Sequence, residues 1–201
     1  MGSEMCIRDR DNSLARQLIA LGHDVTVLPT YLPHFLDEES ATPEQPIFFG
    51  GINVYLQHRF SLFRRTPVWL DKAFDNKWLL RKAAARSGMT SSKDLGEITL
   101  STFRGADGPL VKEVNKVLNW FKNQDTPDII FLSTIMLAGI GKVLKRELNI
   151  PVYGFLQGED SFLDSLLPEY RVEAWKLLAN DVAQLDGCIA PSKYFLSLIH
   201  I

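Results

Sequence analysis

The sequence predicts an α/β fold with a mostly parallel sheet and helices on both of its faces. In the second half of the chain, short apolar runs alternate with longer stretches whose apolar residues recur at helical spacing. The runs lack the alternation of apolar and polar residues, which is typical of parallel strands buried on both faces. They lie at 129–132, 152–156 and 188–190, and a predicted helix follows each of them.

Length and composition are those of one globular domain. The 201 residues suffice for a substantial core, and the hydrophobic content of 46% with 23% charged residues is ordinary for a soluble protein. A net charge of −2 argues against a nucleic-acid binder that depends on overall basicity. The longest apolar stretch, 129–141, is shorter than the roughly 20 residues that span a bilayer.

The two cysteines, Cys6 and Cys188, provide neither a disulfide framework nor the spacing of a metal site. We therefore expect no metal and no bound cofactor. The N-terminus lacks the apolar core of a secretory signal, so we expect the chain to be cytoplasmic.

The first half of the chain predicts a helix–strand unit followed by a hairpin. A helical stripe of leucines ends at Gly22, a residue suited to a helix C-cap, and a strand is expected at 25–28. Two more strands are expected within 47–56, on either side of a turn at Gly50 and Gly51. Glycine also permits close backbone approach to a ligand, so substrate contact by these two residues is the alternative to a plain turn.

Residues 55–86 carry eight Lys or Arg against two Asp, interleaved with aromatic residues. Thr66 and Pro67 mark a helix start within this segment. Basic and aromatic residues on a helix can lie on an anionic membrane face, which would give peripheral contact with the inner membrane. The same composition is also typical of a solvated helix face over a buried one, and both interpretations stay open.

The helices predicted in the second half lie at 95–103, from Pro109 to about 121, from 135 to 148, from about 161 to 167, at 171–184, and from about 191. A glycine-punctuated loop is expected at 104–108. In the helix after Pro109 the expected inward residues are Leu110, Val114, Val117, Leu118 and Phe121. In the last helix they are Val172, Trp175, Leu178 and Val182.

Polar residues stand at helix starts directly after three predicted strands. Ser133 and Thr134 follow the first, Gln157 follows the second, and Ser192 follows the third. The carboxyl ends of parallel strands share one edge of a sheet, so these residues should line one rim. Open α/β sheets bind their ligands at that edge.

The loop after the second strand, Gln157-Gly158-Glu159-Asp160, is the strongest candidate for ligand contact. Two adjacent carboxylates beside a glycine and an amide are suited to binding hydroxyl groups through hydrogen bonds. The structural alternative is that Asp160 caps a helix starting near Ser161, with Glu159 favouring the positive end of that helix.

Four segments in a fixed order carry a resemblance to a known family. They are Leu-Ala-Arg-Gln-Leu-Ile-Ala-Leu-Gly-His-Asp-Val-Thr-Val (14–27), Pro-Asp-Ile-Ile-Phe-Leu-Ser (127–133), Gln-Gly-Glu-Asp (157–160) and Asp-Gly-Cys-Ile-Ala-Pro-Ser-Lys-Tyr-Phe (186–195). Together they resemble the N-terminal domain of a retaining glycosyltransferase of family 4, which has the GT-B fold. The resemblance covers about 12–195.

In that family two Rossmann-like domains face each other across a cleft. The resemblance therefore implies the Rossmann-like half that holds a carbohydrate or lipid-linked acceptor. The nucleotide-sugar donor would be bound mainly by a C-terminal domain that is not part of this sequence. Many members carry a histidine where Gln157 stands, and this departure removes a titratable group from the expected cleft.

Carried over by position, the Gln157–Asp160 loop faces the cleft. Glu159 and Asp160 would be the catalytic pair that orients acceptor hydroxyls, with Gln157, Gly158, Ser133, Thr134 and Ser192 as further substrate contacts. Arg104 would suit a phosphate or carboxylate on the acceptor, and an ordinary surface arginine is its alternative.

Both ends resemble translated adapter sequence, so we expect a domain at 11–195 between foreign or disordered tails at 1–10 and 196–201. The first strand of a Rossmann-like sheet and its glycine-rich loop would precede this domain. We expect 5–7 to fill the place of that strand as a stunted strand, or the sheet to stay incomplete. The fragment should then be unstable and inactive as a transferase.

Two other functions remain open on the sequence. One is a non-catalytic sugar- or nucleotide-binding α/β domain, and the other is half of a sugar-nucleotide epimerase with the same two-domain architecture. A following domain with a donor motif would favour the transferase, and a product assay would separate the transferase from the epimerase.

Overall fold

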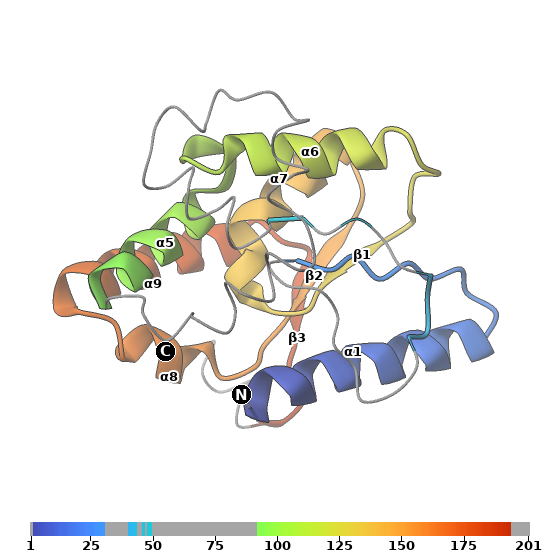
Figure 1. The fold of residues 1–201 in the computed structure, drawn as a ribbon, viewed down its shortest axis with the longest axis horizontal. Helices are drawn as coiled ribbons and strands as arrows, with labels where there is room; N and C mark the ends of the chain where they lie inside the picture. Colours follow the sequence, from blue (N-terminus) through green and yellow to red (C-terminus); the bar gives the residue numbers. More distant parts are fainter. Residues whose placement is uncertain (1, 31–39, 44–45, 47, 50–91, 194–201) are drawn as a thin grey trace. The chain divides into compact units, whose positions relative to one another are not determined.

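The computed structural model describes residues 2–30, 40–43, 46, 48–49 and 92–193 (Figure 1). The chain divides into two compact units, Met1–Asn53 with Pro67–Ala85, and Val54–Thr66 with Arg86–Ile201. Gly50, Gly51, the predicted hairpin turn and the basic segment at 55–86 lie outside the described residues.

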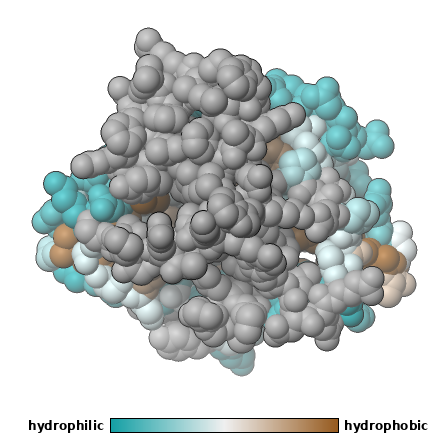
Figure 2. Space-filling model, viewed as in Figure 1, coloured by the Kyte–Doolittle hydropathy of each residue, from teal (hydrophilic) through white to brown (hydrophobic). Residues whose placement is uncertain are grey.

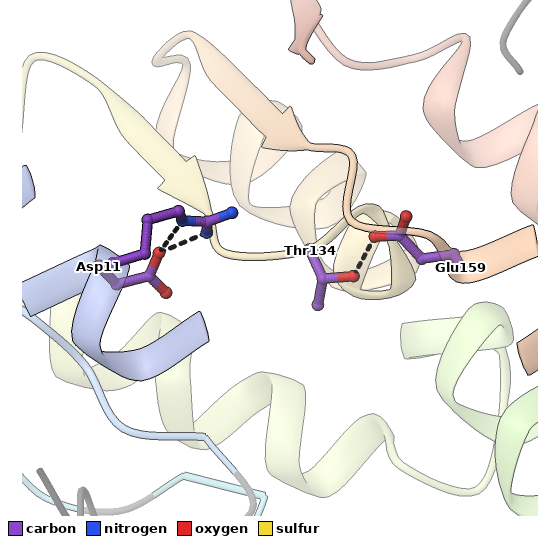
Figure 3. Close-up of polar contacts among 4 residues, drawn as sticks. Asp11, Thr134 and Glu159 are labelled. Carbon is purple, nitrogen blue, oxygen red and sulfur yellow. Dashed lines mark hydrogen bonds and ion pairs between the residues drawn. The ribbon is translucent and has the colours of Figure 1, made fainter. Parts of the chain in front are cut away.

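The first unit contains one long helix, α1 (Gly2–Ala20). Its end is confirmed as predicted, because Gly22 adopts φ 91° and the His23 N–H donates to the Leu18 carbonyl at 3.1 Å. The helix is continuous through residues 5–7, so of the two outcomes expected there the stunted strand is excluded. Within the helix the Arg10 guanidinium pairs with Asp11, and burial raises the pKa of that carboxyl despite the pair (Figure 3).

The strand expected at 25–28 is not formed. Among the described residues this part of the chain makes one isolated parallel bridge, between Thr30 and Phe48, supported by the Phe48 N–H donating to the Pro29 carbonyl at 3.0 Å. The Val27 N–H donates to the Thr42 hydroxyl at 3.4 Å and not to a neighbouring strand. A short apolar run forms a strand only where a ladder partner exists.

The second unit is built on a parallel sheet of three described strands, β1 (Ile130–Leu132), β2 (Val152–Phe155) and β3 (Gly187–Ile189). The order is β1-β2-β3, with Ile130 opposite Val152 and Tyr153 opposite Gly187. The prediction of an α/β fold with a parallel sheet is therefore confirmed for this unit.

The two faces of the sheet carry different side chains. Leu132 and Val152 are buried and lie against Gly141 of α7 (Ala138–Leu148). On the other face Phe131 lies 6.1 Å from Tyr153 and 6.2 Å from Phe155, measured between ring centroids.

On the side of the molecular surface seen in Figure 2, hydrophobic residues among those drawn in colour are scattered between hydrophilic ones.

Helices α5 (Ser92–Arg104), α6 (Val111–Phe121) and α9 (Pro168–Val182) pack around α7. The packing with α5 is close, because a Cβ added at Gly139 would lie 2.2 Å from the Phe103 carbonyl oxygen. Two ion pairs add to the contacts of α7, Lys142 with Asp181 at 2.7 Å and Lys145 with Asp186 at 2.9 Å. The predicted end of α7 is confirmed, since Asn149 takes the left-handed conformation at φ 55°.

The predicted inward face of α6 is confirmed for all five residues, although the helix begins at Val111 and not at Pro109. The predicted inward face of α9 is wrong in part, because Val172 is 73% exposed and Trp175 is 36% exposed. The buried residues of α9 are Ala174, Leu178 and Asp181. The loop expected at 104–108 is largely the end of α5 and a 3₁₀ turn at Gly105–Asp107.

Candidate functional site

Polar residues follow all three described strands at one edge of the sheet. Ser133 and Thr134 come directly after β1, Gln157 comes two residues after β2, and Ser192 comes three residues after β3. The strands are parallel neighbours, so their carboxyl ends lie at the same edge. The sheet thus brings the predicted residues of three separate segments to one rim.

Glu159 is the residue that joins two of these strand ends. Its Oε1 accepts a hydrogen bond of 2.5 Å from the Thr134 hydroxyl (Figure 3). Its Oε2 accepts one of 2.6 Å from the backbone N–H of Gln157. Only 9% of Glu159 is exposed. Hydrogen bonds to a charged group contribute roughly 1.5–3 kcal/mol each, so this carboxylate is held firmly between β1 and β2.

Thr134 is placed by the turn that follows β1. It is the N-cap of the 3₁₀ turn η4 (Ile135–Leu137), and its Oγ1 accepts the Met136 N–H at 3.2 Å. The turn lies close on β2, because a Cβ added at Gly154 would be 2.9 Å from Ile135 Cγ2. The hydroxyl therefore accepts from the backbone and donates to Glu159 at the same time.

Gly158 makes the sharp change of direction between β2 and α8 (Glu159–Asp164). Its φ of 85° lies in the left-handed region, where a residue with a Cβ is strained. α8 begins at Glu159, with Gly158 as its N-cap and no side-chain cap. The structural alternative, in which Asp160 caps a helix starting near Ser161, is therefore wrong, and Asp160 lies inside the first turn.

Two polar atoms of this loop are buried without a hydrogen-bond partner in the described part of the chain, Gln157 Nε2 and Asp160 Oδ1. One is a donor and the other is an acceptor, and two residues lie between them in the sequence. A buried polar atom left unpaired costs roughly 1–3 kcal/mol, so either atom would gain from a polar partner that reached it.

Cys188 is the residue of the rim region that the sequence did not point to. It lies in β3 opposite Gly154 of β2. Burial raises the pKa of the Cys188 thiol, and the negative charge of Glu159 raises it further. Its position in an apolar strand was visible in the sequence, but its proximity to Glu159 depends on the register of two strands.

Arg104 has a structural partner. Its Nη2 lies 2.7 Å from Glu173 Oε1, and both side chains are nearly half exposed. The pair links the last turn of α5 to α9. Arg104 is thus engaged in an ion pair within the protein, which leaves less reason to expect it to hold an anionic group of an acceptor.

Within the described residues no group of three His, Cys, Asp or Glu side chains is arranged to hold a metal ion. No described helix combines the length and apolar character needed to cross a membrane. Comparison with known proteins gave no match, neither to a family model, nor to a curated protein, nor to a solved structure.

Proposed function

We propose that this chain is the Rossmann-like, acceptor-binding half of a retaining glycosyltransferase with the GT-B architecture. The proposal is supported by the sequence resemblance and by the polar rim at the carboxyl edge of the parallel sheet. Its main support is the unpaired donor and acceptor in one loop, Gln157 Nε2 and Asp160 Oδ1.

A sugar hydroxyl suits this pair of atoms better than an ion does. Hydroxyl groups of a sugar can accept from the Gln157 amide and donate to the Asp160 carboxylate, whereas an anion would be repelled by Asp160 and Glu159. A cation would leave the amide donor without a partner. The loop therefore favours an uncharged, polyhydroxylated acceptor.

In the proposed reaction the protein acts mainly by positioning. Asp160 accepts a hydrogen bond from the attacking hydroxyl and orients it, while Glu159 fixes the loop that carries Asp160. The nucleotide-sugar donor is held by a second domain, and its leaving diphosphate takes up the proton of the acceptor hydroxyl. No side chain of the Gln157–Asp160 loop is required as a nucleophile.

A non-catalytic carbohydrate-binding domain is the second candidate. It is favoured by the engagement of both Glu159 oxygens in internal hydrogen bonds, which leaves Asp160 as the carboxylate offered to a ligand. Half of a sugar-nucleotide epimerase is less well supported, because that reaction needs an acid and a base at the cleft.

The test is carbohydrate binding by the purified chain, measured against a panel of neutral oligosaccharides. Asp160→Asn should weaken binding about tenfold, as expected when the acceptor of a hydrogen bond loses its charge. Asp128→Asn is the matched control, since Asp128 is exposed and precedes β1 at the opposite edge of the sheet. Absence of binding, or equal losses in both variants, would contradict the proposal.

A transfer assay with a panel of nucleotide sugars then separates the two candidates. The longer protein containing the proposed second domain should release nucleoside diphosphate in the presence of an acceptor. Binding without turnover in that longer protein would favour the non-catalytic domain.

A further inference from the structure

We propose that Thr134 is a positioning residue, whose hydroxyl fixes Glu159 and through it sets the conformation of the loop that presents Gln157 and Asp160 to an acceptor. The inference deepens the proposed function and rests on it as far as the acceptor is concerned. The connection from Thr134 to the loop is a property of the chain alone and can be tested without a ligand.

The first step is the orientation of the Thr134 hydroxyl. A hydroxyl has one proton, and that of Thr134 is donated to Glu159 Oε1 at 2.5 Å. Its oxygen is already committed as acceptor of the Met136 N–H at 3.2 Å. Because the turn η4 packs against β2, the O–H bond of Thr134 points toward the carboxyl end of β2, where Glu159 lies.

The second step passes from Glu159 to the backbone of the loop. The other carboxylate oxygen accepts the Gln157 N–H at 2.6 Å, across the left-handed turn at Gly158. α8 has only six residues and no side-chain cap, so its own helical hydrogen bonds hold its first turn weakly. Glu159 supplies the missing restraint, and Thr134 restrains Glu159.

The third step concerns the ligand atoms. Gln157 precedes this restraint and Asp160 follows it, so the spacing of the unpaired amide and carboxylate is set by the conformation of residues 157–159. Loss of the Thr134 hydroxyl should make the distance between these two groups more variable without altering the Gln157 amide or the Asp160 carboxylate. A pre-organised loop binds more tightly because less conformational entropy is lost on binding.

Cys188 provides a readout of the Glu159 position that needs no ligand. Burial raises the pKa of the Cys188 thiol, and the negative charge of Glu159 raises it further. Thr134 is uncharged, so a substitution there that leaves the burial of Cys188 unchanged affects the thiol by moving that charge. The chain has one other cysteine, Cys6, which lies in α1 and can be replaced by serine. The alkylation rate of the remaining thiol against pH then reports on Glu159.

The experiment is a double-mutant cycle of Thr134→Val and Glu159→Gln in the Cys6→Ser chain, with Thr134→Ser as the conservative variant. Thermal unfolding of each variant verifies that it folds. Thr134→Val also removes the oxygen that accepts the Met136 N–H, whereas Glu159→Gln leaves that hydrogen bond in place. The two single variants therefore separate the effect of the Met136 hydrogen bond from that of the Thr134–Glu159 hydrogen bond.

We expect Thr134→Val and Glu159→Gln each to move the Cys188 alkylation profile to lower pH. The double variant should match Glu159→Gln alone, and Thr134→Ser should match the unsubstituted chain. Oligosaccharide binding should weaken roughly tenfold in Thr134→Val and recover in Thr134→Ser.

An unchanged Cys188 profile in Thr134→Val, or effects of the two substitutions that add, would overturn the positioning role. If the profile behaves as expected but the unsubstituted chain binds no carbohydrate, the proposed function fails while the restraint by Thr134 stands. If carbohydrate binds equally well to Thr134→Val and to the unsubstituted chain, the restraint does not serve the acceptor.

Discussion

The buried ion pair between α7 and α9 gives an asymmetric prediction for stability. Lys142 Nζ lies 2.7 Å from Asp181 Oδ1, and the side chains are 16% and 3% exposed, respectively. The second oxygen of Asp181 is buried with no hydrogen-bond partner among the described residues. Removing the lysine therefore leaves a carboxylate with nothing to neutralise it, whereas removing the aspartate leaves an ammonium group that can reach water.

We expect Lys142→Met to cost about 3–5 kcal/mol of unfolding free energy, the usual penalty for an uncompensated buried charge. Asp181→Ala should cost less, about 1–3 kcal/mol, because the long lysine stem can turn its charge outward. The double variant Lys142→Met, Asp181→Leu should lie near the original stability, because it removes both charges together.

The pH dependence of the loss follows from the same carboxyl group. Burial raises the pKa of Asp181 above its ordinary value, Lys142 opposes this rise, and the charge of Asp107 adds to it. A carboxyl whose pKa is higher in the folded protein stabilises the fold at low pH and loses that contribution as the pH rises through the folded value. Without Lys142 the pKa rises further, so the penalty of Lys142→Met should be smaller at about pH 4.5 than at about pH 7.

Urea unfolding followed by far-UV circular dichroism, at both pH values, measures these free energies. Two results would refute this account, in which the Asp181 carboxylate is buried and the Lys142 ammonium group can reach water. One is a larger loss of unfolding free energy in Asp181→Ala than in Lys142→Met, and the other is a Lys142→Met loss that does not change with pH.

Three further predictions concern the elements around the site. Leu178→Ala should lower the unfolding free energy by about 2–5 kcal/mol and Val172→Ala by less than about 0.5 kcal/mol in urea unfolding; similar losses would contradict the observed inward face of α9. Gly158→Ala should cost about 1 kcal/mol in the same assay because of the left-handed backbone at that residue, and a stabilised variant would show that the turn is different. The Val152 N–H, followed by Lys145, holds the pKa of Asp186 below its usual range, so its stabilisation is present above the unfolded value and lost as the pH falls through the folded one. Acid unfolding of Asp186→Asn should thus depend less on pH below about 4, and an unchanged acid transition would contradict this.

Helices and parallel strands of the second unit were predictable because their signals are local. Of the five buried residues of α6, apolar spacing predicted Val114, Val117, Leu118 and Phe121, whereas the buried Glu113 was not predicted. The end of α7 at Leu148 was predicted as well. The parallel arrangement followed from apolar runs without alternation. The prediction that polar residues after the strands share one edge needs only this arrangement, and the sheet confirms it.

The failures arise where tertiary context decides the outcome. Asp181 lies on the buried face of α9 because Lys142 neutralises it, and an aspartate at that position moved the predicted face toward Val172 and Trp175. The run at 25–28 is apolar enough for a strand, but the Val27 N–H donates to the Thr42 hydroxyl and not to a neighbouring strand. The hydrophobic pattern alone reveals neither a counter-ion that is distant in the sequence nor the lack of a neighbouring strand to pair with.

Within the candidate site, the sequence predicted which residues gather but not what each one does. Glu159 and Asp160 are adjacent and chemically alike, yet Glu159 is bound internally through both oxygens while one Asp160 oxygen is buried without a partner in the described chain. This difference follows from the left-handed turn at Gly158 and from the position of Thr134, 25 residues earlier in the sequence. The roles of the Glu159 and Asp160 carboxylates become distinct only in three dimensions.

The most direct test of the proposed acceptor site is chemical-shift mapping of the isotopically labelled chain with a neutral oligosaccharide that it binds. We predict that the amide resonances of Thr134 and of residues 157–160 shift with the ligand, while those of Asp128, at the amino edge of the sheet, stay unchanged. Shifts confined to the amino edge, or to residues away from the strand ends, would contradict the assignment of the site.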